Sequence, residues 1–175
     1  MSKILSKIIP VLFVCMILAN TIFARDWQNI LNDKGKLSIE FAGKPTLLDE
    51  PPLPKNDYFE TYIYQLDDKE NNCTYSAVFK FIPDKIKAKY YNKYFEEYIK
   101  GIPQKWSAEL LETSTLKNEN PKITELVMKL FPEINIRLQV LRHNDIIYEI
   151  SIIGNPDIIK NSDSEHFFNS FKLLK

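Results

Sequence analysis

The sequence predicts an α+β protein with a mainly antiparallel sheet flanked by helices, folded as a single domain. Most of its segments alternate apolar and polar residues with a period of two, as half-buried strands do, and they follow one another as hairpins. Two other segments carry apolar residues at helical spacing, and each comes after a run of three strands. Helices that alternate with runs of hairpin strands are typical of α+β proteins.

The first 24 residues have the layout of a secretory signal. A short basic start precedes the apolar run Ile8–Leu18, and small or β-branched residues lead to Ala24. We expect cleavage after Ala24 and export to the periplasm or the cell exterior. The apolar run is shorter than the roughly 20 residues that span a bilayer, so no stable membrane span is expected after the signal is removed. Removal of 24 of the 175 residues leaves one domain of 151, residues 25–175.

Charge and cysteine content exclude some partners. The chain has 23 basic and 23 acidic residues, and two of the lysines lie in the signal, so the mature part has a formal charge of −2. Without a basic excess, we expect no binding of nucleic acid. Cys15 lies in the signal, which leaves Cys73 without a partner for an internal disulfide. Cys73 is a buried small hydrophobe, a reactive thiol, or the link of an oligomer through an intermolecular disulfide.

Three strands are expected in the first half of the mature chain. Lys36–Ala42 alternates as a half-buried strand, and the proline-rich run Leu47–Asp57 is expected to be an extended surface loop. Tyr58–Leu66 and Cys73–Ile82 are rich in aromatic and β-branched residues. The acidic segment between them, Asp67–Asn72, is expected to be a solvated hairpin turn rather than a calcium loop.

A helix is expected to begin at Pro83–Asp84 and to end at Gly101 and Pro103. Apolar residues form a wide stripe along it, which favours packing against the sheet. Three tyrosines of this stripe also form a tentative aromatic binding surface: Tyr90, Tyr94 and Tyr98.

The next segments are a second group of strands. Lys105–Leu116 is ambiguous, since its first part fits a helical face and its second part is extended. Ile123–Phe131 is expected to be a strand. Asn135–Arg142 and Ile146–Ile153 form the clearest hairpin of the chain.

The register of this hairpin depends on the length of its loop. A two-residue turn would set Val140 opposite Glu149, whereas a three-residue loop pairs Val140 with Tyr148. Because a slip of one residue moves every side chain to the other face, the apolar match favours the longer loop. We therefore predict the loop His143–Asn144–Asp145.

The chain is expected to end in a helix. Ser162 and Glu165 have the spacing of a capping box. Phe167, Phe168 and Phe171 then face the sheet.

Several of these segments resemble the PsbP-like family of secreted or periplasmic bacterial proteins. The resemblance rests on five stretches: residues 35–45 (GKLSIEFAGKP), 137–140 (RLQV), 147–150 (IYEI), Gly154 and 167–173 (FFNSFKL). It implies an α/β/α sandwich with an antiparallel sheet between helices, a fold shared with a Ran-binding nuclear-import factor. The matched motifs are packing motifs, so the resemblance supplies no catalytic residue.

The residues themselves predict no catalytic, cofactor-binding or metal site. Neither His143 nor His166 has a second ligand at metal-binding spacing, and no spacing links either of them to Cys73. Three hypotheses remain open. The first is an exported, non-catalytic binding or assembly module with a protein partner. The second is an interaction protein of the envelope or of host contact, and the third is a hydrolase-type enzyme whose carboxylates meet only in the folded protein.

Overall fold

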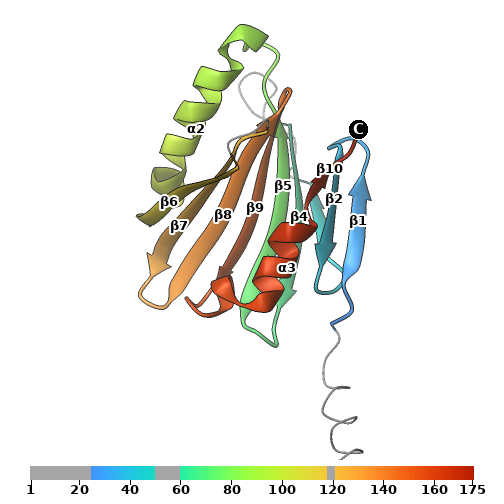
Figure 1. Ribbon diagram of the computed structural model, residues 1–175, viewed down its shortest axis with the longest axis vertical. Helices are drawn as coiled ribbons and strands as arrows, with labels where there is room; N and C mark the ends of the chain where they lie inside the picture. Colours follow the sequence, from blue (N-terminus) through green and yellow to red (C-terminus); the bar gives the residue numbers. More distant parts are fainter. Residues whose placement is uncertain (1–24, 50–59, 118–120) are drawn as a thin grey trace, which may run out of the picture.

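The computed structural model describes residues 25–49, 60–117 and 121–175. These residues form ten strands, two α-helices and two short 3₁₀ turns (Figure 1). In chain order the elements are β1 (Gln28–Asn32), β2 (Leu37–Phe41), β3 (Thr46–Asp49), β4 (Glu60–Asp68), β5 (Cys73–Phe81), η1 (Ala88–Tyr90), α2 (Tyr91–Lys105), β6 (Glu109–Lys117), β7 (Ile123–Phe131), β8 (Ile134–His143), β9 (Ile146–Gly154), η2 (Ile158–Lys160), α3 (Ser162–Ser170) and β10 (Lys172–Leu173).

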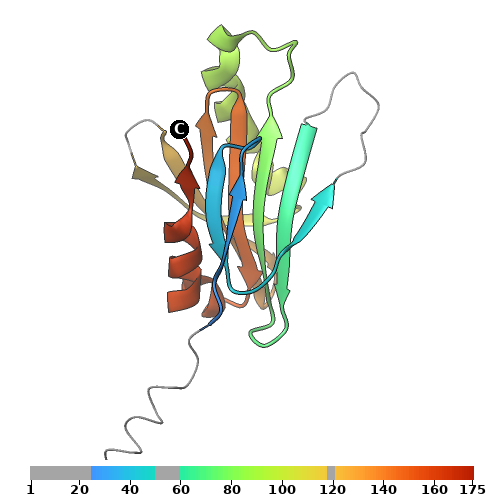
Figure 2. The same cartoon turned by 90° about the vertical axis from the view of Figure 1, so that its right-hand side faces the viewer.

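The strands form two antiparallel sheets. The larger has seven strands in the order β3-β4-β5-β9-β8-β7-β6, and the smaller has three in the order β1-β2-β10. The small sheet and α3 lie on one face of the large sheet, whereas α2 lies on the other (Figures 1 and 2). The expected α+β class, with a mainly antiparallel sheet between helices in a single domain, is confirmed.

Each face of the large sheet has its own apolar core. Between the large and small sheets, Phe167 of α3 packs edge-on against Phe41 of β2 and Tyr75 of β5, with ring centroids 5.2 and 5.1 Å apart. On the other face, Phe95 and Ile102 of α2 are buried against β7, β8 and β9. Since both faces are covered, β9 has no solvent-facing side, and eight of its nine residues are buried.

A glycine brings the small sheet close to the large one. Gly35 lies between β1 and β2, and a side-chain carbon at its position would come within 2.9 Å of the Phe79 ring. Its carbonyl oxygen accepts a hydrogen bond of 2.8 Å from the Tyr148 hydroxyl. Glycine is therefore required here by close approach rather than by turn geometry.

The helix α2 begins and ends later than the sequence indicates. Residues 83–86 form a turn, in which the Ile86 amide donates to the Pro83 carbonyl at 2.8 Å, and Lys87 is extended. The helix then passes through Gly101 and Pro103. It ends in a Schellman motif, in which the amides of Ser107 and Ala108 donate to the carbonyls of Gln104 and Pro103 at 3.1 and 2.9 Å. Ser107 takes the left-handed conformation that glycine usually supplies there, with φ of 52°.

The C-terminal helix is confirmed, with a different cap. Asn161, not Ser162, is the N-cap residue of α3, and its side-chain oxygen accepts a 2.8 Å hydrogen bond from the Ser164 amide. Glu165 does not complete a capping box but forms an ion pair with Arg137 of β8. Phe167 and Phe168 are buried, as predicted.

The predicted register of the β8–β9 hairpin is wrong. The strands are joined by the two-residue turn Asn144–Asp145, with His143 opposite Ile146 and Val140 opposite Glu149. The expectation assumed that Glu149 faces solvent, whereas this carboxylate is buried beneath α2 on the same face as Val140. An apolar match across the strands is no guide to register when both faces of the hairpin are buried.

The remaining strand predictions hold in part. The expected strands around β2, β4, β5 and β7 are confirmed within one or two residues. The ambiguous segment 105–116 divides into the end of α2 and the edge strand β6. Residues 47–49, expected to be loop, belong to β3, and residues 50–59 lie outside the described part of the chain. Neither β1 nor β10 was predicted from the sequence.

Candidate functional site

A buried polar cluster lies between α2 and the large sheet. Lys80 of β5 and Glu149 of β9 are each 6% exposed, and their Nζ and Oε2 atoms are 2.8 Å apart. The Tyr98 hydroxyl of α2 accepts a 2.8 Å hydrogen bond from Lys80 Nζ and donates one to Glu149 Oε1. We call these three residues the buried triad.

The environment of the triad shifts two of its pKa values. Burial lowers the pKa of Lys80, while the neighbouring Glu149 carboxylate opposes that shift. Burial, together with the charge of Glu149, raises the pKa of Tyr98. The side chains of Lys80, Glu149 and Tyr98 bond to one another and leave little surface exposed for a substrate. The triad contains one carboxylate, whereas the hydrolase-type hypothesis requires two, so this geometry favours a structural ion pair.

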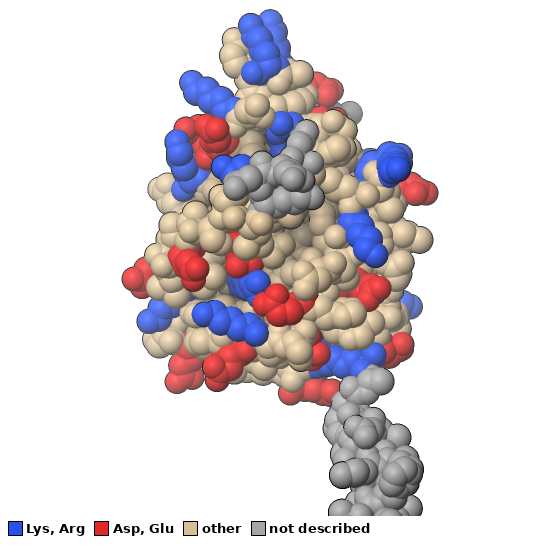
Figure 3. All heavy atoms as spheres, viewed as in Figure 1, with Lys and Arg blue, Asp and Glu red and all other residues tan. Residues whose placement is uncertain are grey.

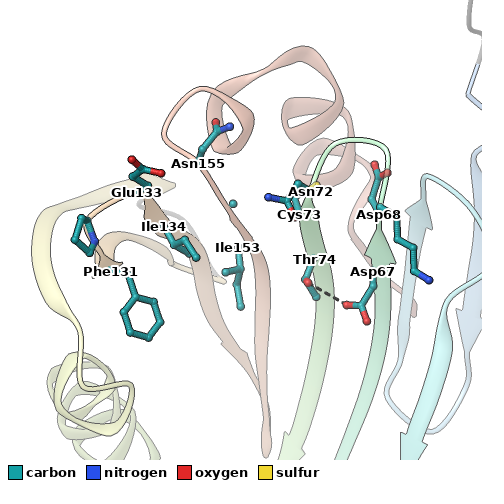
Figure 4. A pocket seen from close by; sticks show the side chains of 13 residues that line it. Asp67, Asp68, Asn72, Cys73, Thr74, Phe131, Glu133, Ile134, Ile153 and Asn155 are labelled. Atoms are coloured by element: carbon teal, nitrogen blue, oxygen red, sulfur yellow. Dashed lines mark hydrogen bonds between the residues drawn. The ribbon is translucent and has the colours of Figure 1, made fainter.

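An open hollow of about 950 Å³ lies at the end of the large sheet where the β4–β5 and β7–β8 turns project (Figure 4). We call it the end hollow. The β7–β8 turn forms one wall and the β4–β5 turn the other, with the end of β9 between them. Among its lining residues are Asp67, Thr74, Phe131, Glu133, Ile134 and Ile153.

The end hollow combines apolar and acidic groups. Phe131 and Ile134 line the hollow and are 63% and 38% exposed. Asp67 accepts a 3.0 Å hydrogen bond from Thr74 on the opposite strand, and Glu133 is exposed on the other wall. The hollow therefore offers an apolar surface with carboxylates on both walls.

One wall of the hollow is fixed by its own turn. The Asp68 carboxylate accepts hydrogen bonds from the Glu70 and Asn71 amides at 3.1 and 3.2 Å. It also forms a 2.7 Å ion pair with Arg25, which binds Asp163 of α3 at 2.9 Å. The expected hairpin is confirmed, but Asp67 and Asp68 belong to β4 and the Asp68 side chain is only 9% exposed, so this part of the segment is not a solvated turn.

The three tyrosines of the tentative binding surface have different environments. Tyr90, in η1, is 50% exposed, Tyr94 is half-buried, and the Tyr98 hydroxyl belongs to the buried triad. Tyr90 and part of Tyr94 are accessible to a partner, whereas Tyr98 faces the sheet. Binding through this row stays a prediction.

The structure does not support an oligomer linked through Cys73. Its side chain is 6% exposed and packs in the core between the two sheets. Burial raises the pKa of its thiol to about 11.

Neither histidine lies beside Cys73 in the structure. Cys73 begins β5 and Phe81 ends it; Phe81 is opposite Ile146 of β9, which is opposite His143 of β8, so His143 lies at the other end of the sheet from Cys73. His166 bonds to Glu40 at 2.6 Å and stacks on Trp27.

Three further features of the described residues concern charge, metal ligands and helix length. Basic and acidic side chains are interspersed on the face seen in Figure 3. Within residues 25–49, 60–117 and 121–175, no group of three or more histidine, cysteine or acidic side chains is placed to hold a metal ion. No helix in these ranges is both long and apolar enough to cross a membrane.

The fold is that of PsbP-like proteins. The structure of cyanobacterial PsbP (CyanoP) from Synechocystis sp. PCC 6803 superimposes with a TM-score of 0.57 over 87% of this chain and 95% of that one, at 11% sequence identity. The Saccharomyces cerevisiae Ran-binding protein Mog1p gives a TM-score of 0.45 over 87% of this chain and 97% of that one, also at 11% identity. No family model and no curated protein sequence matches the chain.

The end hollow and the buried triad were not predicted from the sequence. The hollow joins two turns that are about 60 residues apart in the chain, and it is brought together by the strand order β5-β9-β8. The triad was not predicted because a charged residue in a strand of alternating apolar and polar residues normally lies on the solvent-facing side.

Proposed function

We propose that this protein is an exported, non-catalytic module that binds a segment of a partner protein in the end hollow. The observation that carries the proposal is Phe131, a large aromatic residue that is 63% exposed beside a concave surface. Aromatic residues next to pockets are common centres of binding energy in protein interfaces. The carboxylates of Asp67 and Glu133 favour a partner segment that carries a basic side chain beside an apolar one.

Export after cleavage at Ala24 is part of this proposal. What supports it is the position of Arg25, which would be the first residue of the mature chain. Its guanidinium forms ion pairs with Asp68 and Asp163, so the first residue of the described part of the chain is held against the domain. Amino-terminal sequencing of the exported protein should therefore start at Arg25. A mature chain that starts further along, without Arg25, would contradict this boundary.

Site-specific crosslinking tests the binding surface. A photo-crosslinkable amino acid at Phe131 should yield adducts with a discrete partner in the native envelope fraction. Leu31 of β1 is the matched control, because it is 65% exposed but lies on the small sheet. The same adducts from both positions, or none from Phe131, would count against the end hollow as the binding surface.

The captured partner allows a quantitative test. Phe131→Ala should weaken binding of the purified partner by about 30-fold, which corresponds to the roughly 2 kcal/mol of an interface hot spot. Leu31→Ala should change affinity less than about twofold. Isothermal titration calorimetry would measure both.

A further inference from the structure

The β4–β5 wall of the end hollow projects past the strand beside it. The strand β3 pairs with β4 only from Tyr62 to Gln65, so no described strand lies on the outer side of residues 66–68. Asp68 and Cys73 close the hairpin opposite each other, and neither pairs with a third strand of the described sheet (Figure 4). Because a two-stranded hairpin is only marginally stable by itself, this end needs contacts from elsewhere to keep one position.

Arg25 supplies such a contact. Its Nη2 atom lies 2.7 Å from Asp68 Oδ2, and its Nε atom lies 2.9 Å from Asp163 Oδ2. The side chains of Arg25 and Asp68 are 17% and 9% exposed, so their ion pair is less screened by solvent than a surface pair. Asp163 lies in the first turn of α3, a helix that is anchored in the core by the buried Phe167. A single guanidinium thus links the projecting hairpin end to a fixed helix.

Asp68 passes this contact on to the turn. The carboxylate that binds Arg25 also accepts hydrogen bonds from the Glu70 and Asn71 amides, and a third of 2.9 Å from the Asn71 side chain. The turn that these bonds organise lines the hollow through Lys69. Because one carboxylate both receives Arg25 and shapes the turn, the position of this wall depends on residue 25.

We propose that Arg25 is a positioning residue of the end hollow, which takes its binding shape only when Arg25 is docked between Asp68 and Asp163. This inference rests on the proposed function and adds a means of regulating it. Arg25 does not itself line the hollow, so it acts through Asp68. With cleavage after Ala24, Arg25 is also the first residue of the mature chain, so the loss of one terminal residue would release the wall.

Loss of Arg25 has an electrostatic effect of the opposite sign. It would leave Asp68 without its cation and make the hollow more acidic, which by itself favours a basic partner segment. Charges at the rim of an interface act more on the rate of association than on affinity, so we expect the change in position to dominate. Since the two effects have opposite signs, the affinity of the variant tells them apart.

Binding of the partner captured through Phe131 gives the first test. Arg25→Ala should weaken that binding by about tenfold in isothermal titration calorimetry. Lys172→Ala is the matched control, because it removes one positive charge from an exposed position on the small sheet, and affinity should change less than about twofold. Intact mass confirms that each variant begins at residue 25. Unchanged or tighter binding by Arg25→Ala would overturn this inference, whereas a loss with Phe131→Ala would still support the proposed function.

Chemical rescue separates the shape of the guanidinium from its charge. Ethylguanidinium added to Arg25→Ala should restore most of the affinity, because its planar fork can bond to both carboxylates. Ethylammonium at the same millimolar concentration has the same charge without the fork and should restore little. A variant that had merely lost its fold would respond to neither cation. Equal effects of the two cations would overturn the positioning role.

Hydrogen exchange of the free protein makes the two possible failures distinguishable. In Arg25→Ala the amides of Glu70 and Asn71 should exchange about tenfold faster than in the wild type, because the carboxylate that they bond to is no longer held. In Lys172→Ala their exchange should not change. Faster exchange without any partner captured at Phe131 would place the failure in the proposed function. Unchanged exchange would overturn the role of Arg25 whatever the partner.

Discussion

The face of the large sheet that meets the small sheet and α3 differs from the face beneath α2 in how polar groups are placed. Toward the small sheet the core is dominated by aromatic rings, and Phe79 and Phe167 are fully buried there. Beneath α2 the core is aliphatic around Ile102 and Met128, and it also contains the charges of Lys80 and Glu149. The aromatic face also has ion pairs beside α3, from Arg137 to Glu125 and Glu165, but the charges of Lys80 and Glu149 beneath α2 are more fully enclosed.

The difference follows from what covers each face. The small sheet and α3 make backbone and side-chain hydrogen bonds at their margins, for example from the Glu40 amide to the Ser170 hydroxyl oxygen at 2.9 Å. The backbone groups of α2 bond within the helix and not to the sheet. Apolar packing alone therefore leaves the position of the helix along the sheet weakly defined. Tyr98 bonds to both Lys80 and Glu149 and thereby fixes α2 at one position. Our hypothesis for this protein is that the buried ion pair specifies the position of α2 on the sheet more than it adds to the free energy of unfolding.

The largest expected effect concerns the aromatic face. Phe167→Ala should lower the free energy of unfolding by about 3–5 kcal/mol, because it removes a buried ring that contacts Phe41 and Tyr75. Urea denaturation followed by circular dichroism would measure this loss. Tyr90→Ala, at an aromatic residue that is 50% exposed, should cost less than about 1 kcal/mol. A similar cost for the two variants would contradict the assignment of Phe167 to the core.

The second prediction concerns the ion pair beneath α2. Lys80→Met or Glu149→Leu alone should cost about 3–5 kcal/mol, because each leaves a buried charge without its partner. The double variant should cost less than either single change, since it removes both charges. Denaturation of the four proteins gives the coupling energy.

An exposed pair provides the control for that cycle. Lys100 and Glu97 are 2.9 Å apart, close to the 2.8 Å between Lys80 and Glu149, but both of their side chains are solvent-exposed. Their single variants should leave the free energy of unfolding unchanged within error. Additive effects at Lys80 and Glu149 would show that the two charges are not coupled.

The same ion pair explains why the hairpin register was not predictable from the sequence. The rule that charged residues face solvent sets Glu149 on the polar side, opposite Gln139. In the folded protein Glu149 is beneath α2, and the partner that makes this possible, Lys80, is 69 residues away in the chain. Local alternation contains no information about such a distant partner.

Local signals predicted other elements well. The strands β2, β5 and β7 and the helix α3 depend on patterns within ten residues, and their positions were found. The helix α2 was found with wrong ends, because a Schellman motif with serine in place of glycine is not visible as a stop signal. The end hollow depends on the order of strands in the sheet, which hydrophobic periodicity does not specify.

A smaller effect tests the link between the helix and the ion pair. Tyr98→Phe removes one hydroxyl that bonds to both charged groups, so it should cost about 1–2 kcal/mol. Tyr91→Phe, at a half-buried tyrosine whose ring faces Arg142, should cost less. Thermal unfolding would measure both. Equal losses would mean that the Tyr98 hydroxyl does not hold α2 in place.

The smallest effect concerns Cys73 on the aromatic face and appears only at high pH. Burial raises the pKa of its thiol from 9.0 to about 11, so the folded state keeps the proton where the unfolded state loses it. The stabilisation from this group is complete below pH 9 and is lost as the pH rises through 11. The difference in free energy of unfolding between wild type and Cys73→Ala should therefore shrink across this range. Parallel pH profiles for the two proteins would mean that the thiol is as accessible in the folded chain as in the unfolded one, and the aromatic face would then not be closed to water at this strand end.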